Sequence, residues 1–519
     1  MSPESADLWS SWGKEGIPCI PGATDCHLAG GGASGAPRPV YYPPMSSGLA
    51  IAVYALLLVS AAILVWRRPL FALYAWIVGL AAHNAVMAAL FGAGVRGGAL
   101  TAIQAWKEIL LGVALARVAL DVVRTGRLPF RIHPADVLAG VFAGIVCVYA
   151  VLPQDWLGGT ADRSAIGLAL KHDLVPVGAY FLGRSVILRR EDLVRVAWTI
   201  VGTAATVAVL GLLDDFLIPI SWWRNSAVVD YFHKHLGYDY HGTGGLPENF
   251  VFNNGGDAHG FYRRLVSTFL GPLASAYLFV VALLLGAALL RRPRILAPLS
   301  AVIFAGLLFT FSRSSLLALA AGLVVLGFVT RRWWPVAAAI ATLAVSIAWV
   351  HVFPHVAPTG KWTQQDLVQQ RNHARTQPGA SGSAGSIDEP SIHSHWISLR
   401  EGVRTVVHHP QGYGLGNAGQ TASRTGTPIK AGESNYTETG AETGLLGALV
   451  WIAWGIAILA GLVLAARRTS WWAAGGIAAA FGAALVLAVQ TDVIGDPWMA
   501  YCLWACAGIA LVPVPILRR

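Results

Sequence analysis

The sequence predicts an all-α polytopic membrane protein, and three observations lead to this prediction. Hydrophobic residues make up 55% of the 519 residues and charged residues only 12%, whereas soluble domains contain about 25% charged residues. Apolar runs recur along the whole chain, many of them near the about 20 residues that cross the hydrocarbon core of a bilayer. The basic residues, in contrast, are grouped in short segments between these runs.

Thirteen apolar segments predict about 12 to 13 transmembrane helices. Glycine and proline inside them are compatible with this reading, because neighbouring helices satisfy the backbone groups that a break in a helix exposes. The segments are residues 47–66, 70–93, 100–122, 135–152, 165–186, 194–217, 265–290, 295–311, 314–330, 334–354, 440–466, 471–491 and 497–516.

The basic groups lie at alternate ends of the predicted spans, so the positive-inside rule places those ends in the cytoplasm. With an odd number of spans, the long polar segments then lie outside, and the net charge of +10 indicates a lipid bilayer and no nucleic acid as partner. The predicted division is an extracytoplasmic segment 1–46, transmembrane helices 47–217, an outer loop 218–262, transmembrane helices 263–354, a large outer loop 355–439 and C-terminal transmembrane helices 440–519.

The N-terminal stretch "MSPESADLWSSWGKEG" lacks the basic start and apolar run of a signal peptide. Its predicted place outside the membrane allows Cys19 and Cys26 to form a disulfide, and two unpaired thiols remain an equal alternative. The other cysteines, Cys147, Cys502 and Cys506, fall within spans and are expected to pack there. No group of residues has the spacing of metal ligands, so no metal or cofactor is predicted.

The two outer loops contain most of the polar residues that are candidates for function. Trp222 and Trp223 in the first loop are typical of an interfacial aromatic belt. In the second loop, "PGASGSAGS" is typical of a flexible linker. The segment "HSHWISLREGVRTVV" that follows predicts an amphipathic helix ending at Pro410. The glycine-rich "PQGYGLGNAG" after it predicts a tight turn.

Three segments, taken in order, resemble one protein family. They are "RLVSTFLGP" at 264–272, "FTFSRSS" at 309–315, and "HPQGYGLGNAG" followed by "ESNYTETGAETGLLG". Together they are similar to the motifs of the O-antigen ligases and polymerases, polytopic glycosyltransferases of the GT-C architecture, and they all fall on the predicted outer face. The resemblance implies a multi-pass enzyme of the bacterial cytoplasmic (inner) membrane with its active site facing the periplasm or exterior.

The resemblance also implies a reaction. Such enzymes transfer a glycan from a polyprenyl-pyrophosphate donor, of the undecaprenyl type, to an acceptor hydroxyl on a glycolipid, glycan or protein. We expect a metal-independent, inverting transfer without a cofactor. A ligase is favoured because the single long loop before the final helices resembles that subgroup. A polymerase of lipid-linked repeats is the alternative, and a transporter or flippase of lipid-linked glycans is the alternative of another class.

The family usually has His-Asn where this sequence has Glu433-Ser434, with Tyr436 holding the register of the motif on the acceptor side. The resemblance therefore makes Glu433 the candidate catalytic base, since a carboxylate of suitable pKa and reach can accept a hydroxyl proton. Glu438 and Glu442 lie in the first turns of the predicted helix, where its dipole favours negative charge. Capping or support of the fold is the preferred reading for these two residues, although Glu438 stays a candidate on the acceptor side.

The donor pyrophosphate calls for cations, and arginine binds phosphate oxygens with two parallel hydrogen bonds. Arg264 and Arg313 lie at outer ends of spans and are the main candidates. Arg263 is a further candidate that could contact lipid headgroups instead. Lys107 and Lys171 are additional candidates for the donor site.

Three local details bear on the remaining candidates. Glu108 follows Lys107 by about 100° around a helix and so need not neutralise it. A local pairing with Asp173 is an equal alternative role for Lys171. On the acceptor side the candidates are Arg400 and His409, and a solvated helix face is the alternative for Arg400.

Overall fold

The computed structural model describes residues 45–186, 190–237, 246, 250–252, 260–289, 293–362, 390–469 and 472–512. Within these ranges the chain is an all-α, multi-pass membrane protein, as the sequence predicts, and nine helices are long and apolar enough to cross a membrane. They are α1 (Ser47–Arg67), α2 (Leu70–Gly92), α5 (Pro134–Val151), α7 (Arg163–Ser185), α8 (Arg190–Leu217), α11 (Pro272–Leu289), α13 (Arg313–Thr330), α14 (Trp334–Val356) and α18 (Asn435–Thr469).

The other four predicted spans also form helices, but each is short, broken or charged. The shorter apolar helices are α12 (Pro293–Phe309), α19 (Trp472–Leu487) and the continuous pair η6 (Met499–Leu503) and α20 (Trp504–Ala510). The segment predicted at 100–122 breaks at Ala105 into α3 (Gly98–Gln104) and α4 (Trp106–Thr125). Lys107 therefore lies directly after a helix break rather than inside a continuous span.

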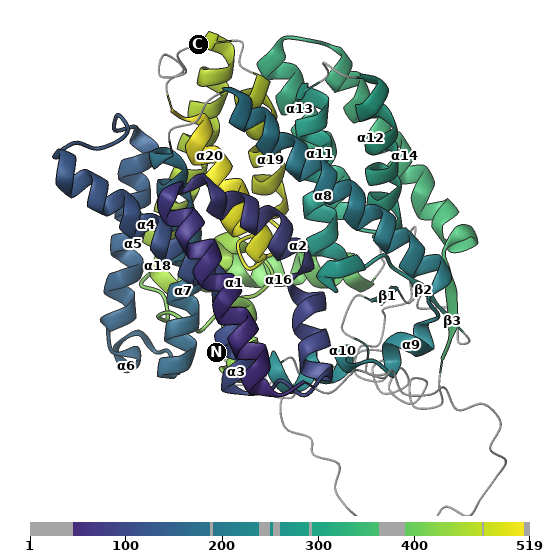
Figure 1. The fold of residues 1–519 in the computed structure, drawn as a ribbon, viewed down its shortest axis with the longest axis horizontal. Coiled ribbons are helices and arrows are strands. Elements are labelled where there is room, and N and C mark those ends of the chain that lie inside the picture. Colours follow the sequence, from purple (N-terminus) through teal and green to yellow (C-terminus); the bar gives the residue numbers. More distant parts are fainter. Residues whose placement is uncertain are drawn as a thin grey trace, which may run out of the picture.

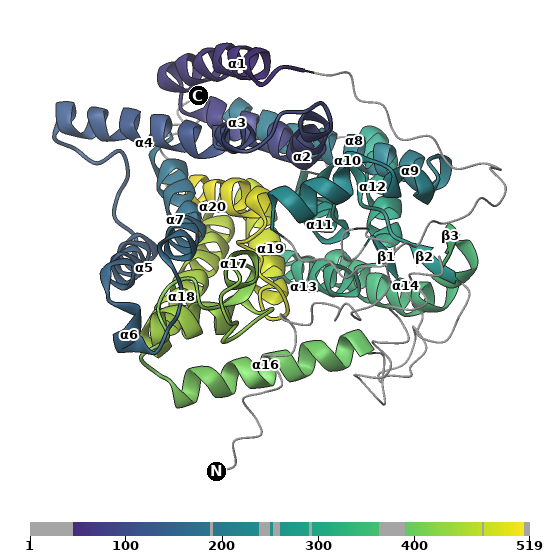
Figure 2. The same cartoon turned by 90° about the horizontal axis from the view of Figure 1, so that it is seen from below.

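The remaining elements are α6 (Gln154–Leu157), α9 (Ile220–Arg224), α10 (Ala227–Asp230), η3 (Tyr231–His235), β1 (Val251–Phe252), β2 (Gly260–Arg263), η5 (Ser267–Phe269), β3 (Thr359–Lys361), α16 (Pro390–His408) and α17 (Gly419–Thr425). Of these, the short helices α6, α9 and α10 and the three strands lie toward the lower end of the long helices in Figure 1. By the predicted topology this end is the outer one. Figure 2 shows α16 along one edge of the molecule beside α18, on which it packs.

The core of the molecule is formed by α19, which packs against α11, α13 and α18. Most of α19 consists of alanine and glycine, and nearly all of its residues are buried. A Cβ atom added to Gly476 would lie 2.9 Å from the side chain of Ala288. Small residues of this kind allow membrane helices to approach closely.

The span predicted at 265–290 becomes helical only at Pro272. The preceding residues form an irregular buried segment, in which Ser267 and Leu270 have positive φ angles. Two hydrogen bonds tie it to α2: the Asn84 side chain donates to the Phe269 carbonyl, and the Thr268 hydroxyl of the segment donates to the Ala81 carbonyl. Non-helical backbone at this depth requires such protein partners.

A small sheet of order β1-β2-β3, which the sequence did not predict, joins the two outer loops. The antiparallel strand β2 pairs with β1 through Val251 and Arg263, and with β3 through Gly260 and Lys361. The sheet holds the backbone of Arg263 and thereby positions Arg264 next to it.

Two sequence predictions about the loops can be compared with the structure, and two cannot. The helix predicted before Pro410 is confirmed as α16. Of the Trp pair, Trp223 is buried and its indole N–H donates to Asp214 at 2.9 Å, so it packs inside the protein, while Trp222 is exposed as a belt residue would be. Cys19, Cys26 and the linker "PGASGSAGS" lie outside the described residues.

Candidate active site at the outer ends of the helices

The glycine-rich loop docks onto a break in α18. Gly444 has a φ of 73° and a ψ of 177°, which interrupts the helix. The carbonyls that the break exposes, those of Ala441 and Glu442, accept hydrogen bonds from the N–H groups of Tyr413 (2.6 Å) and Gly414 (3.0 Å), and the Leu445 N–H donates to the Pro410 carbonyl (2.8 Å). We call this arrangement, residues 410–417 against 441–445, the loop–helix clasp.

The carboxylates of Glu438 and Glu442 accept hydrogen bonds from the backbone of two different segments, the turn at Glu433 and the glycine-rich loop. Glu442 is buried and accepts the Gly416 N–H at 2.9 Å. Glu438 is also buried and accepts the backbone N–H of Glu433. Both carboxylates therefore satisfy backbone groups, in line with the predicted support of the fold.

Two polar side chains anchor the loop to the segment around α6. Asn417 is completely buried; its side-chain amide donates to Gln154 at 2.6 Å, and its oxygen accepts the Thr160 N–H at 2.9 Å. His409 stacks on Tyr413 with ring centroids 3.8 Å apart and contacts the Leu157 carbonyl. The structure therefore places His409 within the packing of the loop.

A buried polar network supports the start of α18. The two ring nitrogens of His172 lie 2.9 Å from Asp173 and 3.0 Å from Asp492, and Asn435 donates to Asp492. Burial alone would raise the pKa of Asp492, which lies outside the spans, but the charge of His172 and the hydrogen bonds from His172, Gly495 N–H and Asn435 outweigh it. The pKa of Asp492 therefore lies below its usual value.

Glu433 lies in the turn before α18 and differs from the two buried glutamates. Its side chain is 49% exposed, and its φ angle of 69° lies in the left-handed region that a glutamate rarely adopts. The Nδ1–H of His395, on α16, donates to Glu433 Oε2 at 2.6 Å. The candidate base thus has an imidazole partner that the sequence did not predict.

The other acceptor-side candidates lie on either side of this turn. Tyr436 is directed into the protein and donates its hydroxyl to the Leu485 carbonyl at 2.8 Å. Arg400 lies on the exposed face of α16. Of these two residues, Arg400 is accessible to an acceptor and Tyr436 is occupied in packing.

Arg263 is buried between two carboxylates at the end of α8. Its guanidinium lies 2.9 Å from Asp214 and 3.1 Å from Asp215, and it also donates to the Ile218 carbonyl. It contributes to the fold in this position, since its positive charge lies between the buried Asp215 and the partly buried Asp214. The adjacent Asp214 and Asp215 thus serve as partners of one arginine. Among the described residues, no group of three or more His, Cys, Asp and Glu side chains is arranged to hold a metal ion.

Arg264 and Arg313, in contrast, meet at a single turn. The Arg264 Nε–H donates to the Thr310 carbonyl at 2.8 Å. Arg313 begins α13 three residues later, and its guanidinium lies 5.8 Å from the ring centre of Phe311 and 5.9 Å from that of Phe252. Arg264 therefore binds the turn that leads into α13, the helix that begins with Arg313.

Lys107 and Lys171 also come together, through Glu108. The Glu108 carboxylate lies 3.5 Å from the Lys107 ammonium and 3.3 Å from that of Lys171. The expectation that Glu108 need not neutralise Lys107 is therefore wrong, because long side chains bridge the angular separation of neighbouring positions. Asp173 pairs with His172 and not with Lys171.

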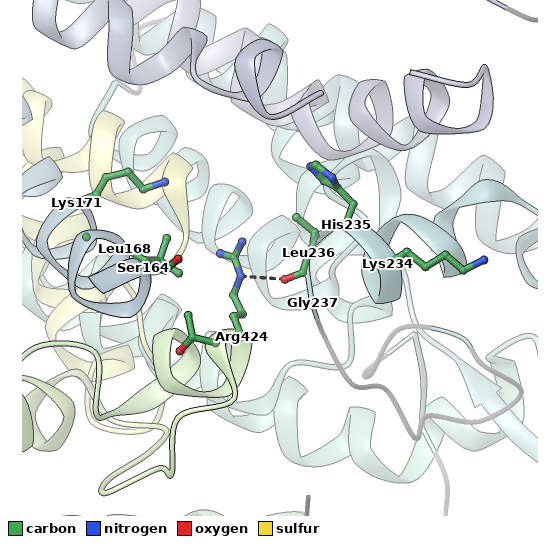
Figure 3. A pocket seen from close by; sticks show the side chains of 10 residues that line it. Ser164, Leu168, Lys171, Lys234, His235, Leu236, Gly237 and Arg424 are labelled. Carbon is green, nitrogen blue, oxygen red and sulfur yellow. Dashed lines mark hydrogen bonds between the residues drawn. The ribbon is translucent and has the colours of Figure 1, made fainter. Parts of the chain in front are cut away.

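A cavity of about 480 Å³ lies between α7, η3 and α17 and is lined by Lys171 and Arg424 among others. Figure 3 shows these two side chains extending into the space between the elements, whereas Lys234 points away from it and pairs with Asp230. Arg424 donates to the Leu236 carbonyl at 3.2 Å and is close enough to Lys107 to act on its charge.

His235 also lines this cavity, and its pKa is lowered by burial and by the positive charge of Arg424. Lys107 on α4, Lys171 on α7 and Arg424 on α17 carry positive charge, and Glu108 is the acid beside the two lysines. The region is therefore positively charged overall. Such a cavity suits an anionic ligand.

The sequence analysis named Arg264, Arg313, Lys107 and Lys171 as single candidates for the donor site, and it missed Arg424 and His395. Arg424 stands in "TASRTGT" with no recognisable motif around it. His395 is in a helix whose partner is 38 residues away in the chain.

A family model described as O-antigen ligase matches residues 298–452. The matched range begins within α12 and ends in α18, so it includes Arg313, Glu433 and the loop–helix clasp but not Lys107 or Arg264. The resemblance that the motifs predict is thereby confirmed over these residues, and it supports a membrane ligase of the glycosyltransferase kind. No curated protein matches the chain.

Proposed function

We propose that the chain transfers a glycan from a polyprenyl-pyrophosphate donor to a hydroxyl of an acceptor glycolipid, glycan or protein, at the outer face of a bacterial cytoplasmic membrane. The observation that supports this most strongly is the convergence of Lys107, Lys171 and Arg424 beside one cavity. Charged side chains near membrane depth are costly and mark functional sites by default. An excess of positive charge there suits the pyrophosphate of a lipid-linked donor.

The arginines at the outer ends of the helices bind the same leaving group. Arg264 and Arg313 offer planar guanidinium groups to phosphate oxygens. As the glycosyl–phosphate bond breaks, negative charge grows on the pyrophosphate, and cations fixed in advance stabilise this charge most in the transition state. Arg263, in its buried pairing with Asp214 and Asp215, supports the fold and not the donor.

The transfer is an inverting, metal-independent displacement. An acceptor hydroxyl attacks the anomeric carbon from the face opposite the pyrophosphate, and the bonding electrons leave with the pyrophosphate. The hydroxyl proton passes to the pair formed by Glu433 and His395. Both side chains of this pair are partly exposed, so an acceptor arriving from outside can reach them.

The direct test is transfer by the purified protein in liposomes, from a purified polyprenyl-pyrophosphate glycan to an acceptor, with EDTA present. Released polyprenyl pyrophosphate is quantified for the wild type and for Arg313→Ala. Arg332→Ala is the matched control, because Arg332 is exposed and follows the opposite end of α13. We expect the wild type and the control to release polyprenyl pyrophosphate. Arg313→Ala should release it about 100-fold more slowly, because removing one fixed donor to a developing anion typically has an effect of this size.

The products separate the remaining alternatives. One added glycan per acceptor identifies a ligase, whereas a ladder of lengthening lipid-linked chains identifies a polymerase. Movement of the intact donor across the bilayer without release of polyprenyl pyrophosphate would contradict the proposal and identify a transporter. Release that EDTA abolishes would contradict the metal-independent mechanism alone.

A further inference from the structure

The contact between His395 and Glu433 joins an outer-loop helix to the turn before α18. The Nδ1–Oε2 distance is 2.6 Å, and the side chains are 41% and 49% exposed. An ionised carboxylate only accepts hydrogen bonds, so the proton of this bond belongs to the imidazole Nδ1. In the neutral ring, the nitrogen with the lone pair is then Nε2.

The position of α16 against α18 is fixed over several turns, so the contact does not depend on one flexible side chain. The Ser398 hydroxyl donates to the Gly432 carbonyl at 3.2 Å. Further along the helix, a Cβ atom on Gly402 would lie 2.8 Å from Thr437, and one on Gly440 would lie 2.7 Å from Val406. This close packing holds His395 beside the turn.

Glu433 itself is held in a strained conformation. Its φ angle of 69° is unfavourable for a residue with a Cβ, and its N–H is bonded to the Glu438 carboxylate. Strained backbone of this kind persists only where the surrounding structure enforces it, and it is found preferentially at functional sites. The strain here fixes the direction of a carboxylate that reaches the imidazole.

Imidazole and carboxyl groups differ in general in their fitness as a base near neutral pH. General-base catalysis is most effective when the pKa of the base lies near the working pH, and in model peptides an imidazole titrates at about 6.5 and a glutamate carboxyl at about 4.3. An imidazole that is oriented by a carboxylate also keeps one tautomer and is stabilised when it becomes charged.

We infer that His395 is the catalytic base of the proposed transfer and that Glu433 is its positioning residue. The assignment rests on the proposed function. The acceptor hydroxyl gives its proton to Nε2 of His395 as its oxygen forms the bond to the anomeric carbon, while the bond to the pyrophosphate oxygen breaks with its electron pair. The imidazolium is stabilised by Glu433 and later releases its proton to water.

The test measures transfer against pH for the full-length protein in liposomes, in the wild type, His395→Ala, His395→Gln and Glu433→Gln, together with the double variant of His395→Ala and Glu433→Gln. His408→Ala is the matched control, because His408 is an exposed histidine of the same helix. Elution as a single species and unchanged binding of polyprenyl pyrophosphate report an intact fold and donor site.

We expect both His395 variants to lose about 100-fold in transfer, the lower range for a general base, and His395→Ala to regain part of it with added imidazole. Glu433→Gln loses less, and the acid limb of its pH profile moves to lower pH because the imidazolium loses its partner. The double variant is no slower than His395→Ala alone, since residues that act as a unit are not additive.

Two results overturn the assignment, and they are distinct. If the wild type transfers and the transfer rate of His395→Ala stays within about threefold of it, the loss is far smaller than a general base would cause. His395 is then not the base, whatever Glu433→Gln does. If the wild type transfers nothing from any donor, the proposed function fails and this assignment fails with it.

Discussion

Glu433 and Glu442 lie nine residues apart in one segment, yet their surroundings differ in every respect. Glu442 is buried in the loop–helix clasp and accepts a backbone N–H of the loop that it supports. Glu433 is half exposed, has a strained φ angle and contacts an imidazole from another helix. The comparison teaches that the carboxylates of this motif divide into one that holds the loop and one that is available for chemistry.

The adjacent arginines at the end of β2 divide in the same way. Arg263 is enclosed by Asp214 and Asp215, whereas Arg264 shares the turn at Thr310 with Arg313. Alternation along a strand directs neighbouring side chains to opposite faces, so two consecutive arginines serve the fold and the candidate donor site separately. Variants of these two kinds of residue should therefore have different effects.

The largest loss of stability is expected for Arg263→Ala. The change leaves the buried Asp215 and the partly buried Asp214 without their cation, and breaking a buried ion pair from one side costs about 3–5 kcal/mol. Thermal unfolding in detergent measures the effect, with the exposed Arg332→Ala as control. A variant as stable as the control would show that Arg263 is not part of the fold and would return it to the donor site.

The next effect is expected for Gly444→Ala in the loop–helix clasp. The backbone angles at Gly444 are nearly restricted to glycine, and an added Cβ would lie 2.6 Å from the Pro410 carbonyl oxygen. Strain and overpacking together should cost about 3 kcal/mol. Gly140→Ala is the matched control, because Gly140 lies in α5 with nothing within 4 Å of its added Cβ. Equal stability of the two variants would mean that the break in α18 is not needed.

A smaller loss of stability is expected for Asn417→Ala in the same loop. It removes the partner of the Thr160 N–H and of Gln154, and a buried polar group left without its hydrogen bond costs about 1–3 kcal/mol. Asn225→Ala, at an exposed asparagine, should leave the unfolding temperature unchanged. If both variants unfold at the wild-type temperature, the anchoring of the loop contributes nothing measurable.

The smallest effect concerns His235 in the cavity. Because burial and then Arg424 lower the pKa of His235, its imidazole is neutral at pH 7 and gains its charge only as the pH falls below the usual value of about 6.5. Once the imidazole is protonated at lower pH, this added charge should tighten binding of polyprenyl pyrophosphate by about threefold, within the range of a partly exposed ion pair.

His235→Gln should lack this extra tightening when both proteins are titrated with the same ligand, which cancels the titration of the phosphate itself. The same lowered pKa makes the folded state less stable as the pH falls, because the unfolded chain binds the proton more readily. Identical pH dependence in the two proteins would mean that His235 does not act on the ligand.

The sequence was sufficient to predict the helices and the positions of Arg264 and Arg313 at helix ends, because long apolar runs and motifs at span ends are local signals. It could not predict that the span from residue 265 begins at Pro272, since the irregular segment depends on side chains such as Asn84 on another helix. The contacts of His172 with Asp492, 320 residues apart, and of His395 with Glu433 depend on tertiary packing, for which no local pattern exists.

The central claim is that Glu433 takes part in the proposed chemistry, whereas Glu442 stabilises the fold. The most direct measurement is the amount of polyprenyl pyrophosphate that Glu433→Ala and Glu442→Ala release per folded molecule. We expect Glu433→Ala to unfold at the wild-type temperature and to lose at least about 10-fold in release. Glu442→Ala should be less stable, while its folded fraction turns over at close to the wild-type rate. The opposite pattern, a stable but inactive Glu442→Ala beside an active Glu433→Ala, would contradict the account.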